Sequence, residues 1–240
     1  MNRNISMAES MIWHTKSDAD VTVASFVDNG TVPHSDLEAC LSLPEKKHAA
    51  GLSDATEIRH YIARRSFQRL FLCKVLNLAL APRELSLIHQ LDRQPSCLDA
   101  PGLSFSFSSS GTTAVACAST KGVVGIDIER SREVENVIAL AQRHFTLAEA
   151  QALAQLPKAM QSPTFLRYWT AKEAGLKAIG QGIIFGLNTF TVSQNEVFSY
   201  SMRGPSPAGL EFSLTYPEIL PGHVVALVQK NSAEKADSHL

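Results

Sequence analysis

Two long segments of the chain carry apolar residues at helical spacing. The pattern predicts one helix over residues 55–79, and the second half of this segment is apolar nearly all round, which indicates burial. It predicts another helix over residues 162–179, with Ser162 as the N-cap and Pro163 at the first helical position. Charged residues fall on the apolar faces of both predicted helices: Arg65, Arg69 and Lys172. The two arginines need anions, which internal salt bridges or a ligand could supply. Lys172 is expected to bury its stem and to need a polar environment for its amine.

Shorter apolar runs predict strands on both sides of residue 121. Three of them precede this point, over residues 21–27, 103–107 and 114–118. Five follow it, over residues 122–130, 189–193, 197–202, 210–216 and 224–228. A Gly-Pro-Ser-Pro sequence at residues 204–207 predicts a turn between two of these strands. The C-terminal part of the chain is therefore expected to be mainly β-sheet.

Two capping-box patterns lie 104 positions apart (146 minus 42). Ser42 with Glu45, and Thr146 with Glu149, each predict the start of a short helix. The same offset aligns Arg69 with Glu173. A capping box is a common pattern, so two interpretations stand. One is chance recurrence, and the other is an internal duplication, which would place a small-molecule site between two halves.

The composition limits the class of protein. The chain has 240 residues, 45% of them hydrophobic and 19% charged, which is enough for one large core or two modest ones. The net charge of −1 gives no bulk attraction to nucleic acid or to an anionic membrane surface. The four cysteines include no C-x-x-C pair, which favours reduced thiols over a metal-binding framework. Neither an N-terminal signal sequence nor an apolar run of membrane-spanning length is visible, so a cytoplasmic protein is expected.

Two carboxylates lie near the end of the strand predicted over residues 122–130. Asp127 and Glu129 point to the same face because side chains alternate along a strand. Adjacent carboxylates repel each other unless a proton or a cation lies between them, and hard oxygen ligands suit Mg²⁺. The alternative is a strand end at which both acids simply face water.

A second group of charges lies on the helix predicted over residues 162–179. Glu173 and Lys177 are four residues apart in the order that favours an intrahelical ion pair, which leaves Lys172 unexplained. Serines at residues 108–110 follow a predicted strand, where hydroxyls and backbone N–H groups can bind a phosphate; an ordinary hairpin turn is the alternative. A serine hydrolase is excluded because the G-x-S-x-G pattern is absent.

Taken together, these motifs resemble the signature of the 4′-phosphopantetheinyl transferases. The sequence GIDIE at residues 125–129, followed by WTAKEAGLK at residues 169–177, matches it in order, separation and residue type. The similarity extends back through FSFSSSG at residues 105–111 and the predicted helix around Arg69, and indicates the longer, surfactin-type branch of the family. In all it covers most of the chain, from about residue 41 to residue 228.

The resemblance implies an α+β fold of two similar α/β halves related by a pseudo-twofold duplication. Each half would pack a small mixed or antiparallel sheet on a long helix, and the active site would lie in the cleft between the halves. The N-terminal half is expected at residues 1–121, the C-terminal half at residues 122–230, and a disordered tail at residues 231–240.

The implied reaction transfers 4′-phosphopantetheine from coenzyme A to a serine of an apo carrier protein, with Mg²⁺ and release of 3′,5′-ADP. Asp127, Glu129 and Glu173 would hold the metal. Glu173, Asp127 and Lys172 form the implied catalytic set, with Glu173 as the general base. The residues implied to bind coenzyme A are Lys46, Arg65, Arg69, Ser108, Ser109, Lys172 and Lys177. For Arg65 an internal salt bridge is an equal alternative.

Three positions depart from the family pattern. Gln94 and Ala49 stand where the family commonly has basic residues, and Ser109 stands where it commonly has histidine. The metal and base positions are intact, so weaker binding of coenzyme A with an ordinary chemical step is expected. Two functions are therefore open: an active transferase, and a non-catalytic relative that binds coenzyme A or a carrier protein and regulates or scaffolds.

The expected partners are coenzyme A and a carrier protein or carrier domain of a fatty-acid, polyketide or peptide synthase. No nucleic acid and no membrane are expected among them, and the protein is expected to be a monomer.

Overall fold

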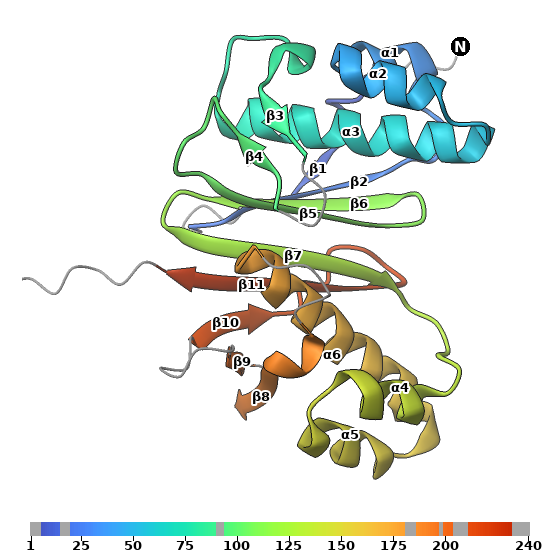
Figure 1. Ribbon diagram of the computed structural model, residues 1–240, viewed down its shortest axis with the longest axis vertical. Helices are drawn as coiled ribbons and strands as arrows, with labels where there is room; N and C mark the ends of the chain where they lie inside the picture. The colour runs from blue at the N-terminus through green and yellow to red at the C-terminus, as the bar shows by residue number, and fades with distance from the viewer. Residues whose placement is uncertain are drawn as a thin grey trace, which may run out of the picture.

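Three helices cover one face of an antiparallel sheet in the first part of the chain (Figure 1). The computed structural model describes residues 6–14, 20–89, 94–180, 186–196, 199–203 and 211–231. The sheet has the order β1-β2-β6-β5 and consists of β1 (Ile12–Trp13), β2 (Thr22–Val27), β5 (Ser104–Ser110) and β6 (Thr113–Ser119). The helices are α1 (His34–Ala39), α2 (Leu43–Ala50) and α3 (Ala55–Val75). Between α3 and β5 lie a 3-10 turn, η1 (Pro82–Glu84), and a short hairpin of β3 (Leu87–Ile88) and β4 (Ser96–Cys97).

The second part of the chain forms a five-stranded antiparallel sheet with a long helix packed on it (Figure 1). The order is β7-β11-β10-β9-β8, with β7 (Gly122–Arg130), β8 (Thr191–Glu196), β9 (Ser199–Arg203), β10 (Glu211–Thr215) and β11 (His223–Asn231). The long helix is α6 (Lys158–Ala178), which contacts β7 and β11. Two shorter helices, α4 (Val137–His144) and α5 (Leu147–Ala154), pack beside α6, and a 3-10 turn, η3 (Leu187–Thr189), precedes β8.

Strands β5 and β7 lie side by side where the two sheets meet. Serine hydroxyls of β5 accept hydrogen bonds from backbone N–H groups of β7: Ser104 from Val124 at 3.0 Å, Ser106 from Ile126 at 3.2 Å, and Ser110 from Arg130 at 3.2 Å. The sequence separation is 20 residues in each pair, so the two strands run in the same direction. Buried apolar residues of both sheets also pack together, including Val115, Cys117, Ile126 and Val225. The sheets are therefore joined by hydroxyl hydrogen bonds along one line and by an apolar core beside it.

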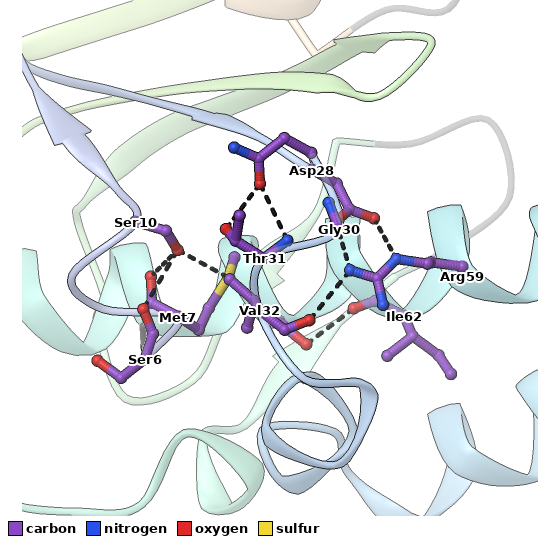
Figure 2. Close-up of polar contacts among 11 residues, drawn as sticks. Ser6, Met7, Ser10, Asp28, Gly30, Thr31, Val32, Arg59 and Ile62 are labelled. Atoms are coloured by element: carbon purple, nitrogen blue, oxygen red, sulfur yellow. Dashed lines mark hydrogen bonds and ion pairs between the residues drawn. The ribbon is translucent and has the colours of Figure 1, made fainter. Parts of the chain in front are cut away.

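An ion pair fastens the beginning of α3 to the end of β2 (Figure 2). Arg59 donates from Nε and Nη2 to the two carboxylate oxygens of Asp28, at 2.8 and 2.6 Å. Its Nη2 also donates to the backbone oxygen of Val32 at 3.1 Å. Asp28 is buried, so this guanidinium supplies the partner that a buried carboxylate needs. The contact fixes the direction of α3, which carries Arg65 and Arg69 in its later turns.

Both long helices predicted from apolar spacing are present, but each has an end that differs from the predicted one. Helix α3 ends at Val75, shortly before Asn77 adopts a left-handed backbone with φ of 49°. Helix α6 begins at Lys158, so Pro163 lies inside the helix and the predicted start is wrong. Ser162 is not an N-cap either, because its hydroxyl bonds the segment that precedes α4.

The expected α+β class is confirmed as a mixed α/β architecture with antiparallel sheets and six α-helices in the described parts of the chain. The predicted turn at residues 204–207 lies outside the described residues. Of the tail predicted at residues 231–240, Asn231 instead ends strand β11, and the rest lies outside the described residues. All four cysteines are buried free thiols. In the described ranges no helix combines the length and the apolar character that crossing a bilayer requires.

Candidate active site

Strand β7 and helix α6 are in backbone contact at Gly125. A Cβ at this position would lie 1.9 Å from the carbonyl oxygen of Ala174 and 2.7 Å from the backbone nitrogen of Ala178. Only glycine permits this approach, because real Cβ atoms do not come so close to other heavy atoms. The contact brings the carboxylates of β7 beside the turns of α6 that carry Glu173 and Lys177.

Asp127 lies at the centre of a junction of three elements. Its Oδ1 accepts hydrogen bonds from Nζ of Lys177 on α6 and from Oγ of Ser108 on β5, both at 2.6 Å. Nζ of Lys177 also donates to Oγ of Ser108 at 2.9 Å. Asp127 is buried, whereas the Lys177 side chain keeps 29% of its surface exposed. The lysine therefore neutralises a buried carboxylate and still reaches solvent.

Glu173 is a buried acid of α6 whose pKa is shifted toward neutrality. Its residue exposure is 8%, and its Oε1 is buried without a hydrogen-bond partner in the described structure. Burial raises the pKa of Glu173 to about 7; the charges of Asp127 and Glu129 add to the effect, and Lys177 opposes it. A carboxyl group with this pKa can exchange a proton near neutral pH, which is the property of a general base or acid.

Glu129 lies at the more exposed end of the same strand face. Its side chain is 26% exposed, and its Oε2 accepts a hydrogen bond from Nη1 of Arg132 at 3.0 Å. The predicted alignment of Asp127 and Glu129 on one face agrees with their shared effect on the Glu173 pKa.

The predicted metal ligands fit a hard divalent cation by chemistry. They are three carboxylates, of which Asp127 and Glu129 raise the pKa of Glu173, and one oxygen of Glu173 is buried and unpartnered among the described residues. Within the described ranges, however, no group of three or more His, Cys, Asp or Glu side chains is drawn together closely enough to hold a metal ion. The structure thus brings the donors to one junction without assembling them into a coordination shell.

Lys172 faces away from this junction and is fully buried, with 0% exposure. Its Nζ donates to Oε2 of Glu149 at 2.7 Å and to the backbone oxygens of Leu187 and Phe190 at 3.1 and 2.5 Å. Burial lowers the pKa of Lys172, and the carboxylate of Glu149 opposes that shift. These contacts favour a structural role over the expected contact with a phosphate.

Arg69 forms the internal ion pair that was the alternative to phosphate binding. Its Nε donates to Oε2 of Glu45 at 2.6 Å, and its Nη1 donates to the backbone oxygens of Pro82 and Leu85, both at 2.9 Å. Its exposure is 2%, so the guanidinium is enclosed by these partners. The structure does not bring Arg69 to the Asp127 junction.

Arg65 has only uncharged contacts in the described structure. Its Nη1 donates to Oε1 of Gln68 at 2.9 Å and contacts the ring nitrogens of His89, while its guanidinium lies over the ring of Tyr61. Burial, with the charge of Arg65 next, lowers the pKa of His89 to about 4, so this histidine is neutral at pH 7. No carboxylate in the described ranges pairs with Arg65, which leaves its charge available to an anion.

Three other positions of the predicted coenzyme site can be placed. Lys46 is half-buried on α2. Ser109 is half-buried and points to the opposite face of β5 from Ser108, the face that carries the core residues Phe105 and Phe107. Gln94 donates from Nε2 to the backbone oxygen of Phe105 at 2.9 Å, so its amide fastens β5.

Two buried glutamates that bind cations of the long helices were recognised in the sequence only as helix caps. Glu45 and Glu149 do close capping boxes with Ser42 and Thr146, as predicted. Each also receives the cation of the neighbouring long helix, Arg69 or Lys172. The signal that could have revealed this was a capping-box glutamate followed by a cation on the apolar face of the next long helix.

A separate cavity of about 280 Å³ lies at the N-terminal end of α3, with Asp28, Arg59 and His60 among its lining residues. None of its lining residues belongs to the Asp127 junction. Its acid and its guanidinium are already bound to each other, so it carries no chemistry comparable with that of Glu173.

Parts of the chain are similar in sequence to known 4′-phosphopantetheinyl transferases. Residues 123–228 match the family model of the 4′-phosphopantetheinyl transferase superfamily. A putative 4′-phosphopantetheinyl transferase of Synechocystis sp. is 29% identical over 160 residues, 66% of this chain and 64% of that protein. The 4′-phosphopantetheinyl transferase HetI of Nostoc sp. is 32% identical over 151 residues, 62% of this chain and 63% of that protein. The 4′-phosphopantetheinyl transferase psf-1 of Bacillus pumilus is 35% identical over 112 residues, 47% of each chain. The chain thus spans less than two thirds of the length of each of these relatives.

Proposed function

Because residues 123–228 carry a domain of the 4′-phosphopantetheinyl transferase superfamily, we propose that the chain transfers 4′-phosphopantetheine from coenzyme A to a serine of an apo carrier protein. The reaction is Mg²⁺-dependent and releases 3′,5′-ADP. The observation that supports this most strongly is the junction of Asp127, Lys177 and Glu173, which combines a buried carboxylate, a cation that reaches solvent and an acid with a pKa of about 7.

Glu173 acts as the general base. The serine oxygen of the carrier forms a bond to the β-phosphorus of coenzyme A, and the bond from that phosphorus to the bridging oxygen of the leaving 3′,5′-ADP breaks. The serine proton passes to Glu173, directly or through a water. A group with a pKa near the operating pH is suited to this step, since it is partly ionised and still basic enough to accept the proton.

Asp127, Glu129 and Glu173 would hold Mg²⁺, which when bound neutralises charge on the pyrophosphate and on the leaving group. Lys177 holds Asp127 and the hydroxyl of Ser108 in place and presents its exposed part to the phosphates. Phosphoryl transfer depends mainly on positioning and on charge neutralisation, which is what these residues provide.

The first part of the chain binds the nucleotide end of coenzyme A. Arg65 supports this assignment because it is a half-buried cation whose hydrogen-bond partners among the described residues, Gln68 and His89, are uncharged. Lys46 and Ser109 complete the proposed set. Arg69 and Lys172 are left out of it because both cations are buried and paired with internal glutamates, Glu45 and Glu149.

Internal symmetry gives the site its location between two halves, residues 1–121 and residues 122–230. Helices α2 and α5 have eight residues each, and α3 and α6 have 21 each. Each short helix opens with a capping box whose glutamate binds a cation of the following long helix. These parallels support a duplicated unit, with the junction at β5 and β7 between its copies.

The carrier is an apo carrier protein or carrier domain of a fatty-acid, polyketide or peptide synthase, and the protein acts as a cytoplasmic monomer. The test is to incubate the protein with coenzyme A, Mg²⁺ and a panel of apo carriers, and to weigh the products by intact-mass spectrometry. We expect a phosphopantetheine mass gain on at least one carrier. Binding of coenzyme A without any mass gain would favour a non-catalytic relative instead.

A further inference from the structure

All three donors of the Lys172 ammonium are in use within the protein. An ammonium group carries three N–H donors and no acceptor. Nζ of Lys172 donates to Oε2 of Glu149 and to the backbone oxygens of Leu187 and Phe190. The side chain has no exposed surface, so no donor is left for a ligand. Lys172 therefore connects α6 to η3 and to the start of β8.

Glu149 in turn gathers the elements around this lysine. Its Oε2 accepts from the backbone N–H and the hydroxyl of Thr146, at 2.9 and 2.7 Å, in addition to Lys172. Its Oε1 accepts from the backbone N–H of Val192 at 3.0 Å. One buried carboxylate thus fixes the beginning of α5, the middle of α6 and the edge strand β8 relative to one another.

The same arrangement, a capping-box glutamate that binds a cation of the next long helix, occurs in the first part of the chain. Oε2 of Glu45 accepts from the backbone N–H and the hydroxyl of Ser42, at 2.9 and 2.8 Å, and from Nε of Arg69 at 2.6 Å. Its occurrence in both parts indicates that a capping-box glutamate serves as the anchor of the long helix that follows it.

Lys172 directly precedes Glu173 in the sequence, so the contact between Lys172 and Glu149 also affects the position of Glu173. Consecutive residues of an α-helix project about 100° apart around its axis. Lys172 is held on the side of η3 and β8. The adjacent Glu173 precedes Ala174, whose carbonyl oxygen packs against Gly125 of β7, the strand that carries Asp127 and Glu129; the charges of these two acids raise the pKa of Glu173. A rotation of α6 that moved one of these side chains would move the other.

We propose that Glu149 is a positioning residue which, through Lys172, sets the rotation of α6 and so keeps Glu173 directed at Asp127. This inference rests on the proposed function for its catalytic consequence, because Glu173 is the base of that reaction. It assigns Lys172 to the same anchor, in place of contact with coenzyme A.

The test compares Glu149→Gln, Lys172→Met and the double variant with the unchanged protein. Glutamine keeps the oxygen that a capping box needs, and methionine keeps the length of lysine without its charge. Lys158→Met is the matched control, because Lys158 lies exposed in the first turn of the same helix. All measurements are made well below the melting temperature, on protein whose circular dichroism shows it to be fully folded.

Lys172→Met leaves the Glu149 carboxylate buried without its cation, so we expect the melting temperature to fall by roughly 10 °C. The kcat for carrier labelling should fall on the order of 10- to 100-fold through misplacement of Glu173, while the KM for coenzyme A is unchanged. The double variant removes both charges and should recover most of the lost melting temperature and part of the lost kcat. Lys158→Met should match the unchanged protein in all three quantities.

A rise of about tenfold or more in the KM for coenzyme A in Lys172→Met, without recovery in the double variant, would overturn the inference, because it is the result expected of a phosphate-binding lysine. A second measurement keeps the test independent of carrier labelling. In a Trp13→Phe background, the near-ultraviolet circular dichroism of Trp169 on α6 should change in Lys172→Met and return in the double variant. If the unchanged protein labels no carrier, the proposed function fails, and the Trp169 signal with the melting temperatures still decides whether Glu149 sets the position of α6.

Discussion

Gly125 of β7 and Ala174 of α6 approach so closely that a Cβ on the glycine would lie 1.9 Å from the alanine carbonyl oxygen. Asp127 follows two residues later on the strand, and Glu173 directly precedes Ala174 on the helix. The distance between the two acids is therefore governed by a contact of backbone with backbone, which leaves little freedom for adjustment.

Gly125→Ala should separate β7 from α6. The added methyl group has to displace backbone atoms, so we expect a loss of stability on the order of 3 kcal/mol and a large loss of carrier labelling. Thermal unfolding and labelling rates of the purified variant measure the two effects. Gly51→Ala is the matched control, because a Cβ there meets nothing closer than 3.4 Å and the backbone φ is −87°. Equal stability of the two variants would show that the contact at Gly125 is not restrictive.

Glu173 should make the protein less stable as the pH rises through neutrality. Its folded-state pKa of about 7 lies above the ordinary value of 4.5, so the folded chain binds the proton more tightly than the unfolded chain between these values. The free energy of unfolding should consequently fall between about pH 4.5 and pH 7 and then level off, by on the order of 3 kcal/mol from this group. Urea unfolding at several pH values, in buffer with a metal chelator, measures this dependence.

Glu173→Gln should remove that contribution and be the more stable protein at pH 8. Glu84→Gln serves as the control, because the Glu84 side chain is 57% exposed. If Glu173→Gln follows the unchanged protein at every pH, the carboxyl group does not titrate near neutrality and its proposed role as the base loses its support.

Arg69→Met should destabilise the protein and leave the binding of coenzyme A unaltered. The change strands the Glu45 carboxylate in the interior, which typically costs about 3 to 5 kcal/mol. Melting temperature and the KM for coenzyme A separate this role from phosphate binding, with Arg83→Met as an exposed control. A raised KM at an unchanged melting temperature would restore Arg69 to the coenzyme site.

Ser109→His should lower the KM for coenzyme A at an unchanged kcat. A histidine adds a ring donor, and when protonated a positive charge, where serine offers one hydroxyl. Adding Gln94→Lys should bring no further gain, because the amide of Gln94 is used to fasten the Phe105 carbonyl. Steady-state kinetics of the single and double variants test this. A KM that rises in Ser109→His, or falls only with Gln94→Lys, would contradict it.

The sequence was sufficient for features that depend on local chemistry. The apolar spacing predicted both long helices, and Ser42 and Thr146 open capping boxes as expected. The motif at residues 125–129 correctly predicted Asp127 and Glu129 on a buried strand. These features are set by neighbours within a few residues.

The sequence was insufficient where contacts come from distant segments. Ser162 and Pro163 suggested the start of α6, but the helix begins at Lys158 and the Ser162 hydroxyl bonds Glu133 and Val134 instead of capping the helix. Arg69 and Lys172 lay on apolar faces that needed a polar partner, and the partners are capping-box glutamates 24 and 23 residues earlier in the chain. The periodicity of a helix shows that a buried charge needs a partner without identifying which segment supplies it.

The most direct measurement is Mg²⁺-dependent labelling of an apo carrier, followed by intact mass and by the position of the modified residue. We expect a phosphopantetheine mass gain on the carrier serine that requires coenzyme A and is lost on chelation. The gain should be absent when that serine is alanine, and its rate should be reduced on the order of 10²- to 10⁴-fold in Glu173→Gln. If no carrier of the fatty-acid, polyketide or peptide type gains mass, or if Glu173→Gln labels at the rate of the unchanged protein, the assignment of this junction as a phosphopantetheinyl transfer site is contradicted.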